Sequence, residues 1–224
     1  MTDLKRLVIF GASTLARLAH YYATREMGLP VAGFVVDDAY LDGHVFLSLP
    51  LSGWSAFCAS NDPNGVALHV AIGYRNMRAR VAAFESVRAS GYETANIRSS
   101  ASYVADDVVL GENNFIMPGA VIESGAALAS NNVVWSNTTI CHDCVIGSHN
   151  FFAANTTLGG GVHVGNGNFL GFSSTVLQGC RIGSETLIGA QSLVRQDTRD
   201  LHQYQGTPAV AVRVIDRDQG VCVD

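Results

Sequence analysis

The densest group of reactive side chains in this 224-residue chain is Cys141-His142-Asp143-Cys144. A histidine beside a carboxylate is a general-base arrangement, because an imidazole with a pKa near 6.5 can take a proton at neutral pH while the acid fixes its tautomer. Gly160, inside Gly159-Gly160-Gly161, follows His142 by eighteen residues. A run of glycines leaves a backbone amide uncovered, which is what a developing oxyanion requires.

Two cysteines flank this histidine, and a C-x-x-C motif also suggests a zinc or redox site. Zinc takes four ligands, and the sequence holds no second cysteine pair of this kind. The six-residue period described below places Cys144 inward and Cys141 on the outward flank, so we expect Cys144 to fill a core and predict no metal site. The five cysteines form an odd, scattered set, which favours reduced thiols.

A second group of candidate site residues follows predicted buried strands in the first third of the chain. It comprises Gly11, Ser13, Asp37, Gly73, Tyr74 and Arg75. The carboxyl ends of parallel strands meet at one edge of a sheet, where a nucleotide can bind and an acid can meet its ribose or base. The match to G-x-G-x-x-G is poor, because Gly11, Ser13 and Ala16 take the glycine positions. Ligand binding and a plain structural turn with a solvated helix start therefore both stay open.

The hydrophobic pattern around these residues predicts alternating strands and helices. Strands are expected over Leu7–Phe10, Val31–Val36, Val45–Leu49 and Ala67–Ile72, with helical segments from Thr14 and over Ser52–Cys58 and Asn76–Ser90. Asn76 is the expected N-cap of the last of these helices. The pattern favours a Rossmann-like α/β domain that ends near residue 98.

The remainder of the chain repeats with a period of six. Aliphatic or aromatic residues recur without insertion at Val104, Leu110, Ile116, Ile122, Leu128, Val134, Ile140, Ile146, Phe152, Leu158, Val164, Leu170, Val176, Ile182, Ile188 and Val194. The residue two positions before each of them is nearly always small. This hexapeptide signature predicts a parallel β-helix with three short strands in each coil of about eighteen residues. His142 and Asp143 then fall on a corner, and Gly160 lies directly above His142 in the next coil.

Composition excludes some function classes. A formal net charge of −5 and a pI near 5.7 argue against binding to nucleic acid or to an anionic membrane surface. The N-terminal apolar run is too short for a signal peptide, and no stretch approaches the ~20 apolar residues of a membrane span. We expect a cytoplasmic protein without membrane insertion.

The chain resembles the bacterial sugar O- and N-acyltransferases of the left-handed β-helix class, which include sialic acid O-acetyltransferases and UDP-4-amino-sugar N-acetyltransferases. The resemblance covers the whole length, and its most specific part is HDCVIG inside the unbroken hexapeptide array. The motifs that carry it are Gly11-Ala-Ser13, Val35-Val-Asp-Asp38, Ala71-Ile-Gly73, His142-Asp-Cys-Val-Ile-Gly147 and Gly206-Thr-Pro-Ala209.

This resemblance implies a homotrimer in which acetyl-CoA, as co-substrate, lies in the groove between two β-helices. It also implies that His142 acts as general base with Asp143 orienting it, and that Gly160 offers its amide to the thioester carbonyl. Phe172 and Ala190 would flank the pantetheine arm. Phe151 replaces a second histidine of many relatives and would contact CoA.

We therefore expect an acetyl-CoA-dependent acyltransferase that acetylates an amino or hydroxyl group of a nucleotide-linked sugar for surface polysaccharide biosynthesis. An O-acetyltransferase acting on a free sugar acid or another small metabolite, and a non-catalytic β-helix subunit for binding or assembly, are the alternatives. The expected division is an acceptor-binding α/β domain over 1–98, a left-handed β-helix over 99–200 and a tail over the CoA site at 201–224. Outward Trp135 and Phe151 would be uncovered in a monomer, which also favours a trimer.

Overall fold

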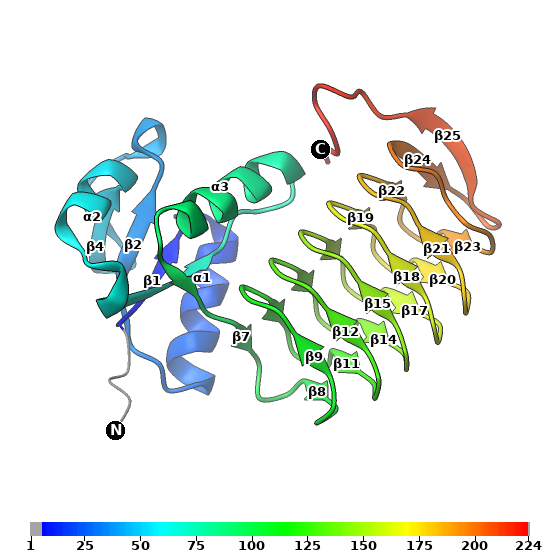
Figure 1. Ribbon diagram of the computed structural model, residues 1–224, viewed down its shortest axis with the longest axis horizontal. Coiled ribbons are helices and arrows are strands. Elements are labelled where there is room, and N and C mark those ends of the chain that lie inside the picture. Colours follow the sequence, from blue (N-terminus) through cyan, green and yellow to red (C-terminus); the bar gives the residue numbers. More distant parts are fainter. Residues whose placement is uncertain (1–5, 224) are drawn as a thin grey trace.

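The computed structural model describes residues 6–223 and consists of an α/β domain, an elongated parallel β-helix and a C-terminal segment (Figure 1). Residues 1–5 of the expected α/β domain and residue 224 of the expected tail lie outside the described residues. The C-terminal segment leaves the far end of the β-helix and returns to the start of α3 (Figure 1). None of the described helices is long and apolar enough to cross a membrane.

The N-terminal domain is built on one six-stranded sheet in the order β3-β4-β2-β1-β5-β6. Its pairs are parallel except β3 with β4. The strands are β1 Arg6–Phe10, β2 Val31–Val36, β3 Val45–Phe46, β4 Leu49–Gly53, β5 Val66–Val70 and β6 Glu93–Thr94. The helices are α1 Thr14–Tyr21, the π-helix η1 Tyr22–Glu26, the 3-10 helices η2 Asp38–Tyr40 and η3 Pro63–Gly65, α2 Trp54–Ser60 and α3 Met77–Ala89.

The expected strands and helices of this domain are present within a few residues of their predicted bounds. Asn76 is confirmed as the N-cap of α3, since its side chain accepts a hydrogen bond of 3.0 Å from the Ala79 amide. The expected strand over Val45–Leu49 is wrong in one respect. The chain turns at residues 47 and 48, both at positive φ, and forms the antiparallel pair β3 and β4 instead of one strand.

The β-helix has three faces, which we number in chain order within each coil. Face 1 contains β7 Ile97–Arg98, β10 Phe115–Ile116, β13 Val133–Val134, β16 Phe151–Phe152, β19 Phe169–Leu170, β22 Leu187–Ile188, β24 His202–Gln205 and the edge strand β25 Val210–Val214. Face 2 contains β8 Tyr103–Val104, β11 Val121–Ile122, β14 Thr139–Ile140, β17 Thr157–Leu158, β20 Thr175–Val176 and β23 Leu193–Val194. Face 3 contains β9 Val109–Leu110, β12 Ala127–Leu128, β15 Val145–Ile146, β18 His163–Val164 and β21 Arg181–Ile182.

The predicted hexapeptide array is confirmed in phase and in length. The second residue of each strand from β8 to β23 is the predicted aliphatic or aromatic residue, and these side chains fill the interior of the coil. Cys144 is buried in this core, as expected. Asparagines at the inward small positions form a ladder along the coil, because the side-chain oxygen of each accepts the backbone amide of the residue one coil above. Its members are Asn114, Asn132, Asn150 and Asn168.

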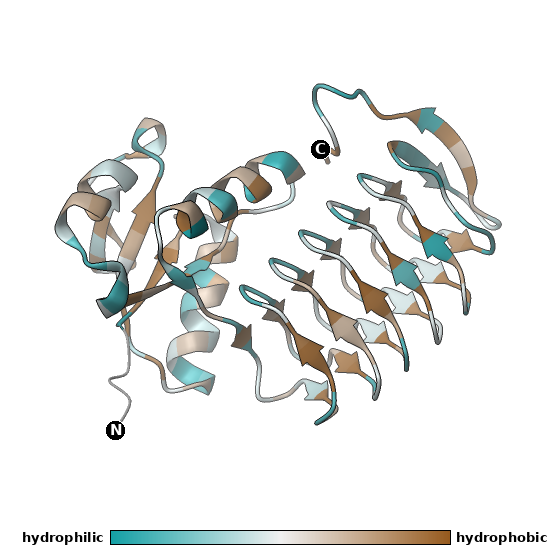
Figure 2. Ribbon diagram, in the orientation of Figure 1, coloured by the Kyte–Doolittle hydropathy of each residue, from teal (hydrophilic) through white to brown (hydrophobic). Residues whose placement is uncertain are grey.

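The outward residues of face 1 are large, apolar and buried, because the N-terminal domain and the C-terminal segment cover this face. Phe115, Phe151 and Phe169 belong to the same apolar cluster as Leu7, Ile9 and Leu15 of the N-terminal domain. The expectation that Phe151 is uncovered is therefore wrong, since only 2% of it is exposed, and Trp135 is half-buried. Figure 2 shows the apolar strands of both domains beside more hydrophilic turns.

A buried arginine fixes the two domains together. Arg80 of α3 is 1% exposed and donates to the carbonyl oxygens of Ile72 (2.9 Å), Asn131 (3.0 Å) and His149 (3.3 Å). Asn113, one coil below Asn131, adds two hydrogen bonds to the backbone of Val70. Burial and the charge of Arg80 lower the pKa of His149 to about 4, so this histidine is neutral and belongs to the domain contact.

Candidate active site

His142 and Asp143 lie between β14 and β15, on the corner where face 2 meets face 3. The imidazole Nδ1 is 2.9 Å from Asp143 Oδ2, and 64% and 73% of the two side chains are exposed. The hydrogen bond to Asp143 raises the pKa of His142 above its ordinary value, and the charges of Asp143 and Glu123 act in the same direction. Asp143 adopts φ +59, a left-handed conformation that aspartate tolerates better than most residues.

The backbone around His142 is held by the neighbouring coils. Glu123 Oε2 accepts the His142 amide at 2.8 Å, and the His142 carbonyl accepts the Gly161 amide at 2.9 Å. These bonds fix the main chain on both sides of the ring. With Nδ1 occupied by Asp143, Nε2 is the ring nitrogen that is free for a substrate proton.

Gly160 lies against the His142 ring. A Cβ atom at this position would be 2.5 Å from both Nε2 and Cε1, so only glycine fits beneath the imidazole as it is placed. The Gly160 carbonyl accepts the Gly179 amide, whereas the Gly160 amide has no hydrogen-bond partner among the described residues. A backbone amide without a hydrogen-bond partner, in the residue that packs against the imidazole, can serve a developing oxyanion.

The neighbouring thiols do not take part in this arrangement. Burial raises the pKa of Cys144 to about 11, so it is a protonated core residue at neutral pH, and burial also raises the pKa of Cys141. Within residues 6–223, no group of three or more histidine, cysteine or acidic side chains is placed to hold a metal ion.

A pocket of about 810 Å³ lies between the N-terminal domain and face 1 of the β-helix. Its lining includes four of the residues predicted for ligand binding, Ser13, Gly73, Tyr74 and Arg75, together with Thr14, Leu15, Ile72, Asn76, Ala79, Trp135, Phe151 and Val223. The floor is aromatic. Phe151 contacts Tyr74 with ring centroids 4.8 Å apart and Trp135 at 5.5 Å, and it stacks on Phe169.

The polar groups of this pocket lie at its rim. Ser13 precedes α1, and its side chain makes no capping hydrogen bond. Arg75 is exposed, and its guanidinium has no ion pair or hydrogen bond among the described residues. A helix N-terminus and an unpaired arginine both attract anions. The pocket thus offers an apolar floor and a rim suited to negative charge.

Two predicted ligand residues do not line this pocket. Gly11 is buried with φ +132, its amide donates to Val35 O at 2.7 Å, and a Cβ atom would be 2.8 Å from the Ala71 carbonyl oxygen. Glycine is therefore required at position 11 because the backbone of Ala71 approaches closely there. Asp37 follows β2 and is exposed, and partial desolvation, followed by the charge of Asp38, raises its pKa.

Phe172 and Ala190 lie on another corner of the prism, where face 1 meets face 2. They are stacked one coil apart and are exposed, Phe172 by 53%. Thr207 Oγ1 donates to Gln191 O at 3.1 Å, so the start of the C-terminal segment lies beside Ala190. Residues 215–223 do not stay at this corner but run to α3.

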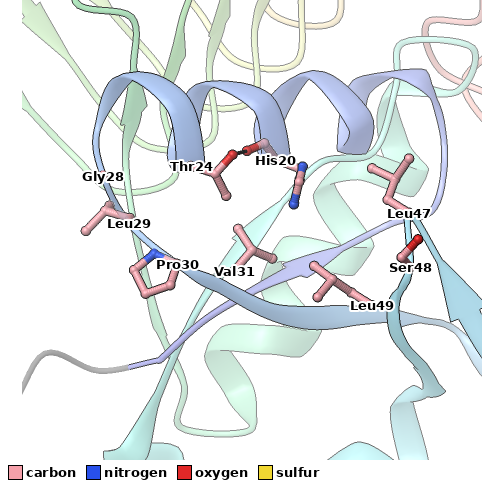
Figure 3. Close-up of a pocket in the computed structure, with 9 residues that line it drawn as sticks. All are labelled: His20, Thr24, Gly28, Leu29, Pro30, Val31, Leu47, Ser48 and Leu49. Carbon is pink, nitrogen blue, oxygen red and sulfur yellow. Dashed lines mark hydrogen bonds between the residues drawn. The ribbon is translucent and has the colours of Figure 1, made fainter.

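A second, more open pocket of about 470 Å³ lies at the opposite edge of the N-terminal sheet (Figure 3). Val31 and Leu49 line it at the amino ends of β2 and β4, and His20 and Thr24 face it from the helices above. None of the predicted site residues lies there, so we do not regard it as the candidate site.

The candidate residues therefore form two sets that do not meet within one chain. The aromatic pocket lies against face 1 of the β-helix, whereas His142 lies on the corner between faces 2 and 3. In a triangular prism this corner is opposite face 1. The sequence did not indicate that Ile72 and Val223 line the pocket, or that Trp135 and Phe151 are in contact there. An outward apolar residue carries no sign of which segment of the chain covers it.

The chain resembles solved acetyltransferases over nearly its whole length. Residues 107–142 match the family described as bacterial transferase hexapeptide (six repeats). A comparison with curated proteins finds no match. PerB from Caulobacter crescentus, in complex with CoA and GDP-perosamine, is 27% identical, with 94% of this chain and 98% of that chain covered and a TM-score of 0.84.

Two further structures agree with this likeness. A histidine-to-alanine variant of GDP-perosamine N-acetyltransferase from Caulobacter crescentus, also with CoA and GDP-perosamine, is 27% identical over 94% of this chain and 98% of that chain, with a TM-score of 0.85. The acetyltransferase domain of PglB from Neisseria gonorrhoeae, in complex with acetyl coenzyme A, is 22% identical over 93% and 99% of the two chains, with a TM-score of 0.83. The latter shows the shared fold.

Proposed function

We propose that this chain, which belongs to the bacterial sugar acyltransferases with hexapeptide repeats, transfers an acetyl group from acetyl-CoA to an amino group of a nucleotide-linked sugar. The observation that carries the proposal is the His142 site. A histidine oriented by Asp143 presents its free nitrogen beside an uncovered amide at Gly160, on a corner open to a substrate.

In the proposed reaction His142 acts as general base. As the acceptor amine attacks the thioester carbonyl, its proton passes to Nε2 of His142, and the Asp143 carboxylate stabilises the imidazolium. The Gly160 amide donates to the carbonyl oxygen, on which negative charge develops. The C–S bond then breaks, and the proton held at Nε2 can pass to the departing thiolate.

We assign the two ligands to different parts of the surface. Acetyl-CoA is placed along face 2, between the corner that carries His142 and Gly160 and the corner that carries Phe172 and Ala190. The acceptor is placed in the aromatic pocket, where Arg75 and the α1 N-terminus suit its phosphates. Because Phe151 forms the floor of that pocket, we assign it to the acceptor and not to CoA.

The separation of the two sets supports an oligomeric site. The aromatic pocket of one protomer requires the His142 corner of a second copy, because its own His142 lies on the far side of the prism. A homotrimer closes such head-to-tail contacts with three equivalent sites. Light scattering that gave a stable monomer at micromolar concentration would remove this arrangement from consideration.

The finer fold assignment belongs to the same proposal. We infer that the N-terminal domain is Rossmann-like, supported by the parallel order β4-β2-β1-β5, and that the β-helix is left-handed, supported by the likeness to PerB. The division at residues 98 and 200 is the one predicted from the sequence, whereas strand pairing extends the coil at both ends, because β7 pairs with β10 and β24 pairs with β22.

Thiol release from acetyl-CoA tests the proposed function directly. The panel consists of GDP- and UDP-linked amino sugars, matched nucleotide sugars with only hydroxyl groups, and a free sialic acid. We expect release with at least one nucleotide amino sugar and N-acetylated product by mass spectrometry. Release only with a hydroxyl acceptor would favour an O-acetyltransferase, and no release with any acceptor would favour a non-catalytic subunit.

A further inference from the structure

The end of the chain, residues 215–223, forms a strap across the start of α3. Ile215 and Val221 are 5% and 1% exposed and belong to the apolar cluster that covers face 1. The strap turns at Asp216, whose side chain accepts the amides of Asp218 and Gln219, and the Gly220 amide then donates to the Asp216 carbonyl. Residues 215–223 are thus an ordered segment that has its own internal hydrogen bonds and contributes side chains to the core.

Arg78 clasps this strap to the β-helix. Its Nε and Nη2 donate to the two carboxylate oxygens of Glu185 at 2.6 and 2.8 Å, while Nη1 donates to the carbonyls of Arg217 and Asp218 at 2.7 and 3.1 Å. One guanidinium therefore joins α3, the coil and the strap. Such a forked arrangement is specific to arginine. Arg78 is consequently not available to an anionic ligand in this structure.

Gly220 packs directly against the Arg78–Glu185 ion pair. It has φ +67, and a Cβ atom there would be 2.6 Å from Arg78 Nε and 3.0 Å from Glu185 Oε1. Any side chain would press on the ion pair, and the left-handed conformation is unfavourable for residues other than glycine. The position therefore couples the backbone of the strap to the clasp.

Beyond the clasp, the strap reaches the aromatic pocket. Val221 O accepts the Met77 amide at 3.0 Å, the Val223 amide donates to Arg75 O at 3.2 Å, and Cys222 forms an antiparallel bridge with Asn76. Val223 itself lines the pocket beside Tyr74 and Arg75. The strap thus holds residues 75–77, the short segment that carries the unpaired arginine, by hydrogen bonds at both its ends.

We propose that the C-terminal strap, clasped by Arg78 and Glu185, positions Arg75 for an anionic group of the acceptor and forms one wall of the acceptor pocket. The proposal rests on the proposed function for the identity of that ligand. Arg78 is a positioning residue, because it touches the strap and not the pocket. The strap does not touch the His142 corner, so it acts on the acceptor and not on acetyl-CoA.

The test compares two arginines of the same helix. Arg78→Ala opens the clasp, whereas Arg88→Ala removes a similarly exposed pair, Arg88 with Glu112, that also joins α3 to the coil but lies away from the strap. We expect Arg78→Ala to raise the acceptor KM by about tenfold or more, with the acetyl-CoA KM and kcat nearly unchanged. Arg88→Ala should change the acceptor KM by less than about twofold. Arg78→Lys keeps the charge without the fork and should give an intermediate KM.

Gly220→Ala provides a second variant that leaves both charges in place. Gly43→Ala is its control, because Gly43 also has positive φ but open space around its Cβ position. Gly220→Ala should raise the acceptor KM as Arg78→Ala does, and Gly43→Ala should not. The proposal would be overturned if the two arginine variants had equal effects. It would also be overturned if both KM values rose together while kcat fell, because the strap would then have only a structural role.

Hydrogen exchange separates this proposal from the proposed function. In Arg78→Ala the amides of Met77 and Val223 should exchange faster than in the wild type, whereas in Arg88→Ala they should not. If wild-type protein acetylates no acceptor, the proposed function fails and exchange alone decides whether the strap holds residues 75–77. Unchanged exchange in Arg78→Ala would overturn the proposal whatever the activity.

Discussion

Phe151 and Phe152 are neighbours on β16 that face opposite ways, which allows the pocket to be tested against a matched core residue. Phe151 is 2% exposed and forms the floor of the aromatic pocket, in contact with Tyr74, Trp135 and Phe169. Phe152 is 0% exposed and fills the interior of the coil. Replacing either residue by alanine removes the same number of atoms from a buried site.

The two substitutions should differ in stability in a direction set by their surroundings. Truncation of a buried phenylalanine costs about 3–5 kcal/mol, and the cost grows with the volume of the cavity left behind. Phe152→Ala leaves an enclosed cavity inside the coil, so we expect about 5 kcal/mol. Phe151→Ala opens into an existing pocket of about 810 Å³ that water can enter, so we expect about 3 kcal/mol.

The kinetic effects should run in the opposite order. Phe151→Ala should raise the acceptor KM by about tenfold, because a pair of stacked aromatic faces contributes about 0.5–1.5 kcal/mol and the floor also loses apolar area. Phe152→Ala should leave the acceptor KM near that of the wild type. Urea unfolding and steady-state kinetics on the same preparations measure both quantities. An increase in the acetyl-CoA KM alone in Phe151→Ala would refute the reasoning and return Phe151 to the CoA side.

Two further predictions concern the His142 corner. Asp143→Asn keeps a residue that tolerates φ +59 but replaces the carboxylate, whose hydrogen bond and charge raise the His142 pKa, by a neutral amide, so the pKa falls and the acidic limb of the kcat/KM profile should move to lower pH. A limb that stays in place or moves to higher pH would contradict this sign. Gly160→Ala would place a Cβ atom 2.5 Å from the imidazole and should lower kcat by about 10²-fold with an unchanged melting temperature, measured by thiol release and calorimetry. A variant with wild-type kcat would show that the ring does not work from this position.

The parts of this fold that could be predicted are those set by local period. A strict repeat of six fixes which residue of each strand of the coil faces inward, because inward and outward positions alternate along a strand. The same period placed His142 and Gly160 one above the other, and the structure brings them into contact. Asn76 at the start of α3 was predictable because an N-cap is a local feature of sequence.

The parts that could not be predicted depend on how distant segments pack. In the sequence Arg80 looks like an ordinary helix residue, yet it is buried and donates hydrogen bonds to three carbonyl oxygens. Two of these belong to coils more than fifty residues away in the sequence. Phe151 reads as an outward residue, and nothing in its own hexapeptide shows that the N-terminal domain covers it. Val223 reaches the pocket only because the C-terminal segment turns back from the far end of the β-helix to the start of α3.

The most direct test of the account is the activity of His142→Asn with acetyl-CoA and the best nucleotide amino sugar. Asparagine keeps polarity and approximate size at an exposed corner but cannot take the proton. We predict that kcat falls by about 10²–10⁴, the usual contribution of general acid–base catalysis, while acetyl-CoA affinity and the melting temperature stay near wild type. A variant that retained most of its activity at neutral pH would contradict the assignment of His142 as base and leave positioning as the main source of rate.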